Sequence, residues 1–281
     1  MKQLILIGFV AVGSVIISSC KKNKYDNSNS PKYNAIAENV FSEMTNMTDQ
    51  AIRGNMIYYK NGEVIVNDIN DAKPEIQPKS ACNVIITLDT LGPNKTITID
   101  WGSTNCECND GKIRRGKIVT TFTGSYYAQG TVITHTPVNY YVNNNKVEGT
   151  KTVTNMGLNG NGQPYYNVVV DGAVYLATNE VINYVSNRVR TFVAGYDTPL
   201  NFWDDEYDIT LTSTAEVIGG DSYTAQTTTP LHVKIGCAYV TKGILVVTPQ
   251  DKPARTIDYG NGTCDGSFTI EVNGTTYTVV L

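Results

Sequence analysis

The chain has 281 residues, with 22 Lys and Arg against 26 Asp and Glu, which gives a formal net charge of −4 and an isoelectric point near 5.3. This balance excludes the basic surface that a phosphate backbone requires, so we expect no nucleic-acid partner. The 18 Tyr and 24 Gly, together with abundant Thr and Val, favour strands and turns, because β-branched and aromatic side chains suit a pleated surface.

Residues 1–19 have the organisation of a secretory signal peptide. Lys2 supplies a positive charge, and the apolar run over 4–17 is too short for a comfortable membrane span. The Ile-Ser-Ser-Cys sequence that ends at Cys20 resembles the lipobox of bacterial lipoproteins. The alternative is an ordinary secretory signal followed by a chance cysteine. We predict that Cys20 becomes the lipidated N-terminus, whose acyl chains hold the protein at a membrane with about 0.8 kcal/mol per buried methylene.

Residues 20–32 are polar, rich in lysine and without apolar periodicity, which predicts a flexible tether. The lysines either contact anionic lipid or are simply solvated.

An amphipathic helix is predicted over 33–54, where Gly54 is placed to end it. Its apolar face comprises Ala37, Val40, Phe41, Met44, Met47, Thr48 and Ala51. We expect this face to pack on a β core. Binding to a membrane surface is the alternative, disfavoured by Glu38, Glu43 and Asp49.

Residues 55–281 are predicted to form an antiparallel β domain with roughly 12 to 15 strands. Asn-Gly at 61–62 and at 273–274 predicts two hairpins with two-residue turns. Segments such as 96–101, 207–212 and 231–237 alternate apolar and polar residues, as strands with one wet face do. The expected fold class is therefore mainly β: one N-terminal amphipathic helix packed on a large antiparallel sheet, which is either a curved half-barrel or a sandwich.

A pattern of Thr-Ile-Asp-aromatic-Gly-x-x-x-Cys occurs at 98–106 and again at 256–264. With an upstream cysteine and a following Asp-Gly, the two copies span 82–111 and 237–266. Disulfides persist in exported proteins, so we predict one bridge within each copy, at about 3 kcal/mol each. The predicted pairs are Cys82 with Cys106 and Cys237 with Cys264, which leaves Cys108 over.

Two other interpretations of this repeat involve chemistry. Cys106 and Cys108 can form a redox or metal site, but no His or further Cys nearby completes a zinc set. Asp100 and Asp258 can be paired catalytic carboxylates, but an Asp before an aromatic-Gly turn is more often a turn-capping residue.

The densest acidic cluster comprises Trp203, Asp204, Asp205, Glu206 and Asp208. Carboxylates at this spacing can bind Ca²⁺ or serve in a glycosidase, and the chain's many aromatic rings can stack on a sugar. A solvated strand edge that resists aggregation is the simpler interpretation. We expect no cofactor, with Ca²⁺ as the alternative.

Catalytic motifs of the common hydrolases are absent from the sequence: there is no Gly-x-Ser-x-Gly, His-Glu-x-x-His or Gly-rich phosphate loop. The two histidines, His135 and His232, are both expected on polar faces of strands. Arg188 and Arg190 share one face of an expected strand, which can receive an anion, although a solvated face is the default. We therefore expect a protein without catalytic activity.

Four segments resemble a group of uncharacterised lipoproteins of Bacteroidetes: GKIVT at 116–120 with Gly124, YYVN at 140–143, VEGTKTVTN at 147–155 and DYGNGTCD at 258–265. The resemblance covers nearly all of the mature chain, implies an outer-membrane lipoprotein and brings no known activity. The basic residues after Cys20 differ from the acidic export signal of surface-exposed lipoproteins in this group, so we expect the periplasmic side.

These observations predict a membrane-anchored protein with a binding or structural role in the cell envelope, whose partner is an envelope protein, a lipid or a glycan. The alternative is a glycan-binding module or glycan-directed hydrolase that uses the acidic and aromatic surface. A helix-covered, concave half-barrel would resemble the lipoprotein carriers of the envelope, which hold acyl chains, at the level of fold alone.

Overall fold

The structure is a computed structural model, and it describes residues 27–53, 55–60, 63–68, 84–91, 94–108, 112–198, 204–234, 237 and 239–280. Several predicted features lie outside these residues: the signal peptide, Cys20, Gly54, the Asn-Gly turn at 61–62, Cys82, the Asp-Gly at 110–111 and Trp203.

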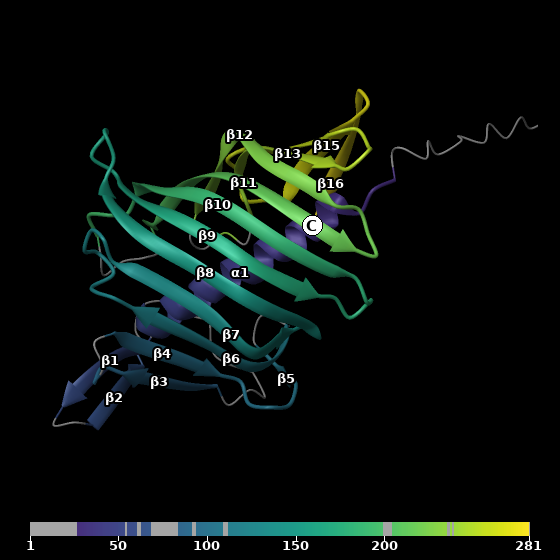
Figure 1. The fold of residues 1–281 in the computed structure, drawn as a ribbon. Helices are drawn as coiled ribbons and strands as arrows, with labels where there is room; N and C mark the ends of the chain where they lie inside the picture. The colour runs from purple at the N-terminus through teal and green to yellow at the C-terminus, as the bar shows by residue number, and fades with distance from the viewer. Residues whose placement is uncertain are drawn as a thin grey trace, which may run out of the picture.

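One curved antiparallel sheet of 14 strands makes up most of the fold (Figure 1). It runs from β16 at one edge to β3 at the other, nearly in chain order, with β5 paired beside β6. The strands are β3 (Ile85–Asp89), β4 (Lys95–Asp100), β5 (Cys106–Glu107), β6 (Ile113–Phe122), β7 (Val132–Val142), β8 (Asn145–Leu158), β9 (Pro164–Tyr175), β10 (Val181–Ala194), β11 (Glu206–Ile218), β12 (Tyr223–Lys234), β13 (Lys242–Pro249), β14 (Arg255–Asn261), β15 (Ser267–Val272) and β16 (Thr275–Val280). A separate hairpin consists of β1 (Asn55–Lys60) and β2 (Glu63–Asp68).

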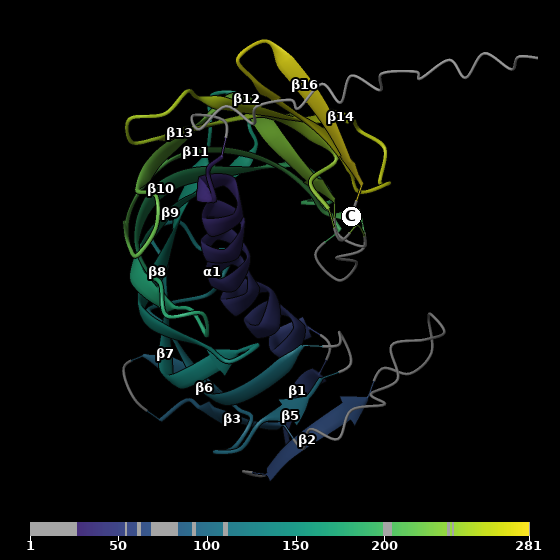
Figure 2. The ribbon, with the colours of Figure 1, turned by 90° about the vertical axis from the view of Figure 1, so that its right-hand side faces the viewer.

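The single described helix, α1 (Ser30–Arg53), lies inside the curve of this sheet (Figure 2). Phe41 and Met44 of its predicted apolar face are fully buried, and Ala37, Val40, Thr48 and Ala51 are also buried. The predicted fold class is therefore confirmed in its curved, open form. Among the described residues, no helix is both long and apolar enough to cross a membrane.

Alternation along the strands sorts the side chains between the two faces of the sheet. In β10, Ile182 and Tyr184 point toward α1 and are fully buried, whereas Val185 is 43% exposed on the opposite face. At the C-terminal hairpin, Asn273 and Gly274 have φ of 51° and 73° between β15 and β16. These angles fit the type I′ turn that the Asn-Gly sequence predicts.

The two copies of the repeat lie near opposite edges of the sheet, one at β4 and one at β14. In each copy, an aspartate at or near the strand end accepts a hydrogen bond from the glycine two residues later: Asp100 from Gly102 N at 2.8 Å, and Asp258 from Gly260 N at 2.9 Å. Both glycines have positive φ, of 80° and 88°. The turn-capping interpretation of the two aspartates is thus the one observed.

The second copy is closed by the predicted disulfide between Cys237 and Cys264. In the first copy, Cys106 is disulfide-bonded, while its predicted partner Cys82 lies outside the described residues. Cys108 carries a half-buried thiol.

Candidate functional site

Buried ion pairs attach α1 to the concave face of the sheet. The Arg114 side chain on β6 is 1% exposed and donates to Glu43 Oε1 through Nε at 2.6 Å, and Lys112 contacts Glu43 Oε2 at 2.8 Å. On β10, Arg188 contacts Glu38 Oε2 at 2.8 Å. The expectation of a solvated face at Arg188 is wrong, because this arginine pairs with a helix carboxylate.

A second group of polar contacts lies between these two ion pairs. Lys151 Nζ donates to the carbonyl oxygen of Phe41 at 3.0 Å. His135 lies within 3.3 Å of the Thr45 and Thr48 hydroxyls and 2.9 Å from that of Thr120. His135 was predicted on a polar face of its strand; its neighbours are polar, but they belong to the contact with α1, and the side chain is buried. Burial, helped by the positive charges of Lys151 and Arg190, holds the pKa of His135 well below its usual range.

The contact surface between α1 and the sheet therefore contains charges as well as apolar side chains. An acyl-chain carrier needs an apolar cavity, because a buried charge beside a hydrocarbon chain is costly unless it is paired. In the described part of the chain, α1 occupies the concave face through ion pairs and close packing. A ligand site outside the area that α1 covers is more consistent with this arrangement.

The acidic cluster at 204–208 is divided between the two faces of the sheet. Glu206 and Asp208 point away from α1, where Lys234 contacts Glu206 at 2.7 Å and His232 contacts Asp208 at 2.8 Å. Asp205 is 3% exposed and lies on the other face. Within the residues that the structure covers, no group of three or more His, Cys, Asp or Glu side chains converges as metal ligands would.

Asp205 belongs to an aromatic cluster at the sheet end opposite the start of α1. We call it the distal aromatic cluster; it comprises Tyr126, Tyr127, Pro164, Tyr166, Arg190, Phe192, Gly195, Tyr196, Asp205 and Tyr207. These residues come from the β6–β7 and β10–β11 connections and from the ends of β9, β10 and β11. The sheet brings them together from positions 126 to 207 of the chain.

Arg190 occupies the interior of the distal aromatic cluster. Its guanidinium lies 5.0 Å from the ring centre of Tyr166 and 4.8 Å from that of Tyr207, and it donates to the Tyr126 hydroxyl at 2.8 Å. Both ring distances are within the range of a cation–π interaction. The hydroxyl of Tyr207 in turn donates to Asp205 Oδ2 at 2.9 Å. One cation and one carboxylate are thus held in place by the aromatic side chains around them.

A small cavity of about 30 Å³ opens in the distal aromatic cluster, with Asp205, Phe192 and Tyr166 in its wall. Tyr127 and Tyr196 also line it and remain 53% and 47% exposed. Gly195 is required at its edge, because it has φ of 86° and a Cβ would lie 2.7 Å from Asp205 Oδ1. The cavity admits a water-sized group, and the exposed rings offer flat surfaces beside it.

A wider concavity of about 310 Å³ lies over β10–β13, on the sheet face turned away from α1. Its lining is neutral and includes Asn187, Thr212 and Gln226. It therefore lacks the combination of ring surface and fixed charge that distinguishes the distal aromatic cluster.

No family model, curated protein or solved structure matches this chain.

Proposed function

We propose that this chain is a lipid-anchored binding protein of the bacterial outer membrane, on its periplasmic side, without catalytic activity. In this proposal, lipidated Cys20 is the anchor and the distal aromatic cluster is the ligand site. The observation that supports a ligand site is the pair of half-exposed rings, Tyr127 and Tyr196, beside a cavity with the buried carboxylate of Asp205 in its wall.

Carbohydrate is the ligand class that this surface fits best. The C–H faces of a sugar ring pack on aromatic rings, and its hydroxyl groups require fixed polar partners. Asp205 and Arg190 are polar groups of this kind, already held in place by Tyr207 and Tyr126. We therefore propose a glycan of the cell envelope as the ligand.

Binding is favoured over hydrolysis by the distribution of carboxylates. Glycosidases usually place two carboxyl groups on either side of the scissile bond. Asp205 is the carboxylate in the described lining of the cavity. The neighbouring acidic residues Glu206 and Asp208 pair with Lys234 and His232 on the opposite face of the sheet. This arrangement supports a recognition site.

The ligand proposal is tested by measuring binding of a panel of envelope oligosaccharides to the mature chain, and by repeating the measurement with Tyr196→Ala. Loss of one stacking ring is expected to weaken binding about tenfold, equivalent to about 1.4 kcal/mol. Tyr175→Ala is the matched control, because Tyr175 is a 39% exposed tyrosine at the opposite end of β9. Equal losses in both variants, or no binding by any sugar in the panel, would overturn the assignment.

The anchor is tested separately by fractionation. The wild-type protein should be found in the outer membrane and carry an acylated N-terminal cysteine in the mass spectrum, whereas Cys20→Ala should not be acylated. Protection from added protease in intact cells is expected for the periplasmic side.

A further inference from the structure

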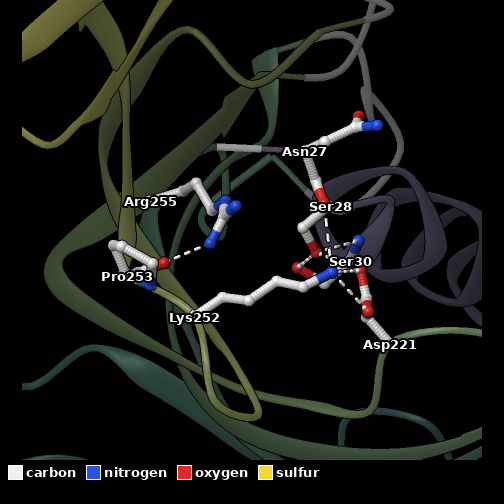
Figure 3. A network of polar contacts seen from close by, with 7 residues as sticks. All are labelled: Asn27, Ser28, Ser30, Asp221, Lys252, Pro253 and Arg255. Carbon is white, nitrogen blue, oxygen red and sulfur yellow. Dashed lines mark hydrogen bonds and ion pairs between the residues drawn. The ribbon is translucent and has the colours of Figure 1, made fainter. Parts of the chain in front are cut away.

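The chain is held by a polar network just before α1 begins (Figure 3). Lys252 Nζ donates to both carboxylate oxygens of Asp221, at 2.6 and 2.7 Å, and to the Asn27 carbonyl oxygen at 3.0 Å. Ser28 Oγ donates to Asp221 Oδ2 at 2.7 Å. Next to Lys252 in the chain, Arg255 at the start of β14 donates to the carbonyl oxygen of Pro253. We call the contacts among Asn27, Ser28, Asp221 and Lys252 the entry clamp.

The entry clamp shortens the predicted tether. Ser30 is fully buried and is the first residue of α1, so residues 27–32 belong to the folded domain instead of to a flexible segment. Tyr33, in the first turn, donates its hydroxyl to Glu180 at 3.4 Å. Only residues 21–26 separate the clamp from Cys20.

The three loops that contact this entry point lie at one end of the sheet. Asp221 is in the β11–β12 loop, Lys252 in the β13–β14 loop and Glu180 in the β9–β10 loop. In an antiparallel meander, alternate connections lie at the same end, and these three occupy the right-hand end in Figure 1. The distal aromatic cluster draws on the β6–β7 and β10–β11 connections, which lie at the other end.

A length limit follows from covalent geometry. Cys20 and Asn27 are seven residues apart (27 − 20), so their Cα atoms are at most about 25 Å apart even in a fully extended chain. Strand β9 has 12 residues and spans about 40 Å between its two ends. The tether is therefore shorter than the sheet is long.

We propose that the sheet end formed by the β9–β10, β11–β12 and β13–β14 loops is the membrane-facing surface of the domain, with the lipid headgroups as its partner. This inference rests on the proposed lipidation of Cys20. Lys21, Lys22 and Lys24 strengthen it, because each lysine near anionic lipid contributes about 1 kcal/mol and draws the tether toward the surface. The distal aromatic cluster then points away from the membrane.

Distance-dependent quenching by labelled lipid headgroups tests this orientation. A fluorophore is coupled to an azide-bearing residue at position 177 or at position 161, both exposed and in the turns at the two ends of β9. Because the two ends of β9 are about 40 Å apart, quenching at position 177 should be at least about threefold stronger than quenching at position 161. Equal quenching, or stronger quenching at 161, would overturn the orientation.

Two ways of anchoring separate this inference from the proposed lipidation. The first uses protein lipidated by the cell and reconstituted in phosphatidylethanolamine and phosphatidylglycerol vesicles. The second uses the chain from residue 20 with Cys108→Ser, coupled through the Cys20 thiol to a maleimide lipid. If the cell-made protein does not associate with vesicles, lipidation is refuted, while the second preparation still decides the orientation.

The entry clamp supplies a further control. Lys252→Met keeps the aliphatic part of the side chain and removes the charge that bonds Asp221 and Asn27. Release of residues 27–29 lengthens the tether, so the contrast between positions 177 and 161 should decrease. Lys242→Met, at the exposed opposite end of β13, should leave the contrast unchanged. An unchanged contrast in Lys252→Met would show that the clamp does not determine the orientation.

Discussion

Replacing Glu43 by Gln should strongly destabilise the fold, because it leaves the Arg114 guanidinium buried without its counter-charge. The two side chains are 7% and 1% exposed, so water cannot compensate for the lost carboxylate. Breaking a buried ion pair by removing one partner costs about 3 to 5 kcal/mol. For a domain of this size, the expected decrease in melting temperature is roughly 6 to 20 °C.

The effect is measured by urea unfolding followed by circular dichroism, with Glu148→Gln as the control. Glu148 pairs with Lys146 at 2.5 Å, but its side chain is 45% exposed. Removing this exposed pair should cost no more than about 1 kcal/mol. The comparison separates the effect of burial from the loss of one negative charge.

The double variant Glu43→Leu with Arg114→Met tests the physical cause. If the cost arises from an uncompensated buried charge, replacing both partners by apolar side chains should restore much of the stability that Glu43→Gln loses. A double variant as unstable as Glu43→Gln, or a Glu43→Gln variant as stable as Glu148→Gln, would show that this ion pair does not hold α1 on the sheet.

Three further predictions concern the same fold. Because burial lowers the pKa of His135, the unfolded chain takes up a proton below pH 6.5 that the folded chain does not. The free energy of unfolding should therefore fall by up to about 1.4 kcal/mol for each pH unit below 6.5. The urea midpoints at pH 7.5 and pH 5.5 should differ less in His135→Gln than in the wild type. Gly172→Ala places a Cβ 2.4 Å from the Glu148 carbonyl oxygen and 2.6 Å from Phe41 Cζ, and it should cost about 1 to 3 kcal/mol by the same assay. Gly160→Ala, with nothing within 4 Å, should be neutral. Cys237→Ser removes a disulfide between residues 27 positions apart and should lower the free energy of unfolding by about 3 kcal/mol. Mass spectrometry of unreduced peptides should find Cys82 joined to Cys106; a link from Cys82 to Cys264 would contradict the repeat.

The local features of this fold could be predicted from the sequence, because their causes are local. Helical spacing identified the face of α1 that packs on the sheet, and Asn-Gly identified the turn after β15. The repeated Asp-aromatic-Gly pattern identified two turns with the same hydrogen bond. Strand ends were less accurate: the segment predicted at 231–237 belongs to β12, which begins at Tyr223 and ends at Lys234, and 16 strands are described where 12 to 15 were expected.

The buried charges were missed, although the sequence holds a signal for one of them. Arg188 has the same parity along β10 as the buried residues Ile182, Tyr184 and Ser186, so alternation places it on the concave face. Its partner Glu38 is distant in the sequence, and only the packing of α1 identifies it. A charged residue at an apolar position of a strand is therefore better interpreted as half of a buried pair.

The distal aromatic cluster could not be predicted, because its members are brought together by the register of several strands. Tyr127, Tyr166 and Tyr196 are far apart in the sequence, and no spacing rule relates them. The acidic segment at 204–208 was recognised as a candidate site, but Glu206 and Asp208 of β11 pair with Lys234 and His232 on one face of the sheet, whereas Asp205, just before the strand, lies on the other. Only Asp205 of that segment lines the cavity.

The position of α1 has a consequence for the order in which the protein folds. The strands pair mostly with their neighbours in the chain, so the sheet can grow hairpin by hairpin with short loop closures. The helix precedes all of them, yet its partners Arg114 and Arg188 are on β6 and β10. We therefore expect α1, although it precedes the strands in the chain, to be the last element to dock. Pulse-labelling hydrogen exchange should detect protection of the sheet amides before that of the helix.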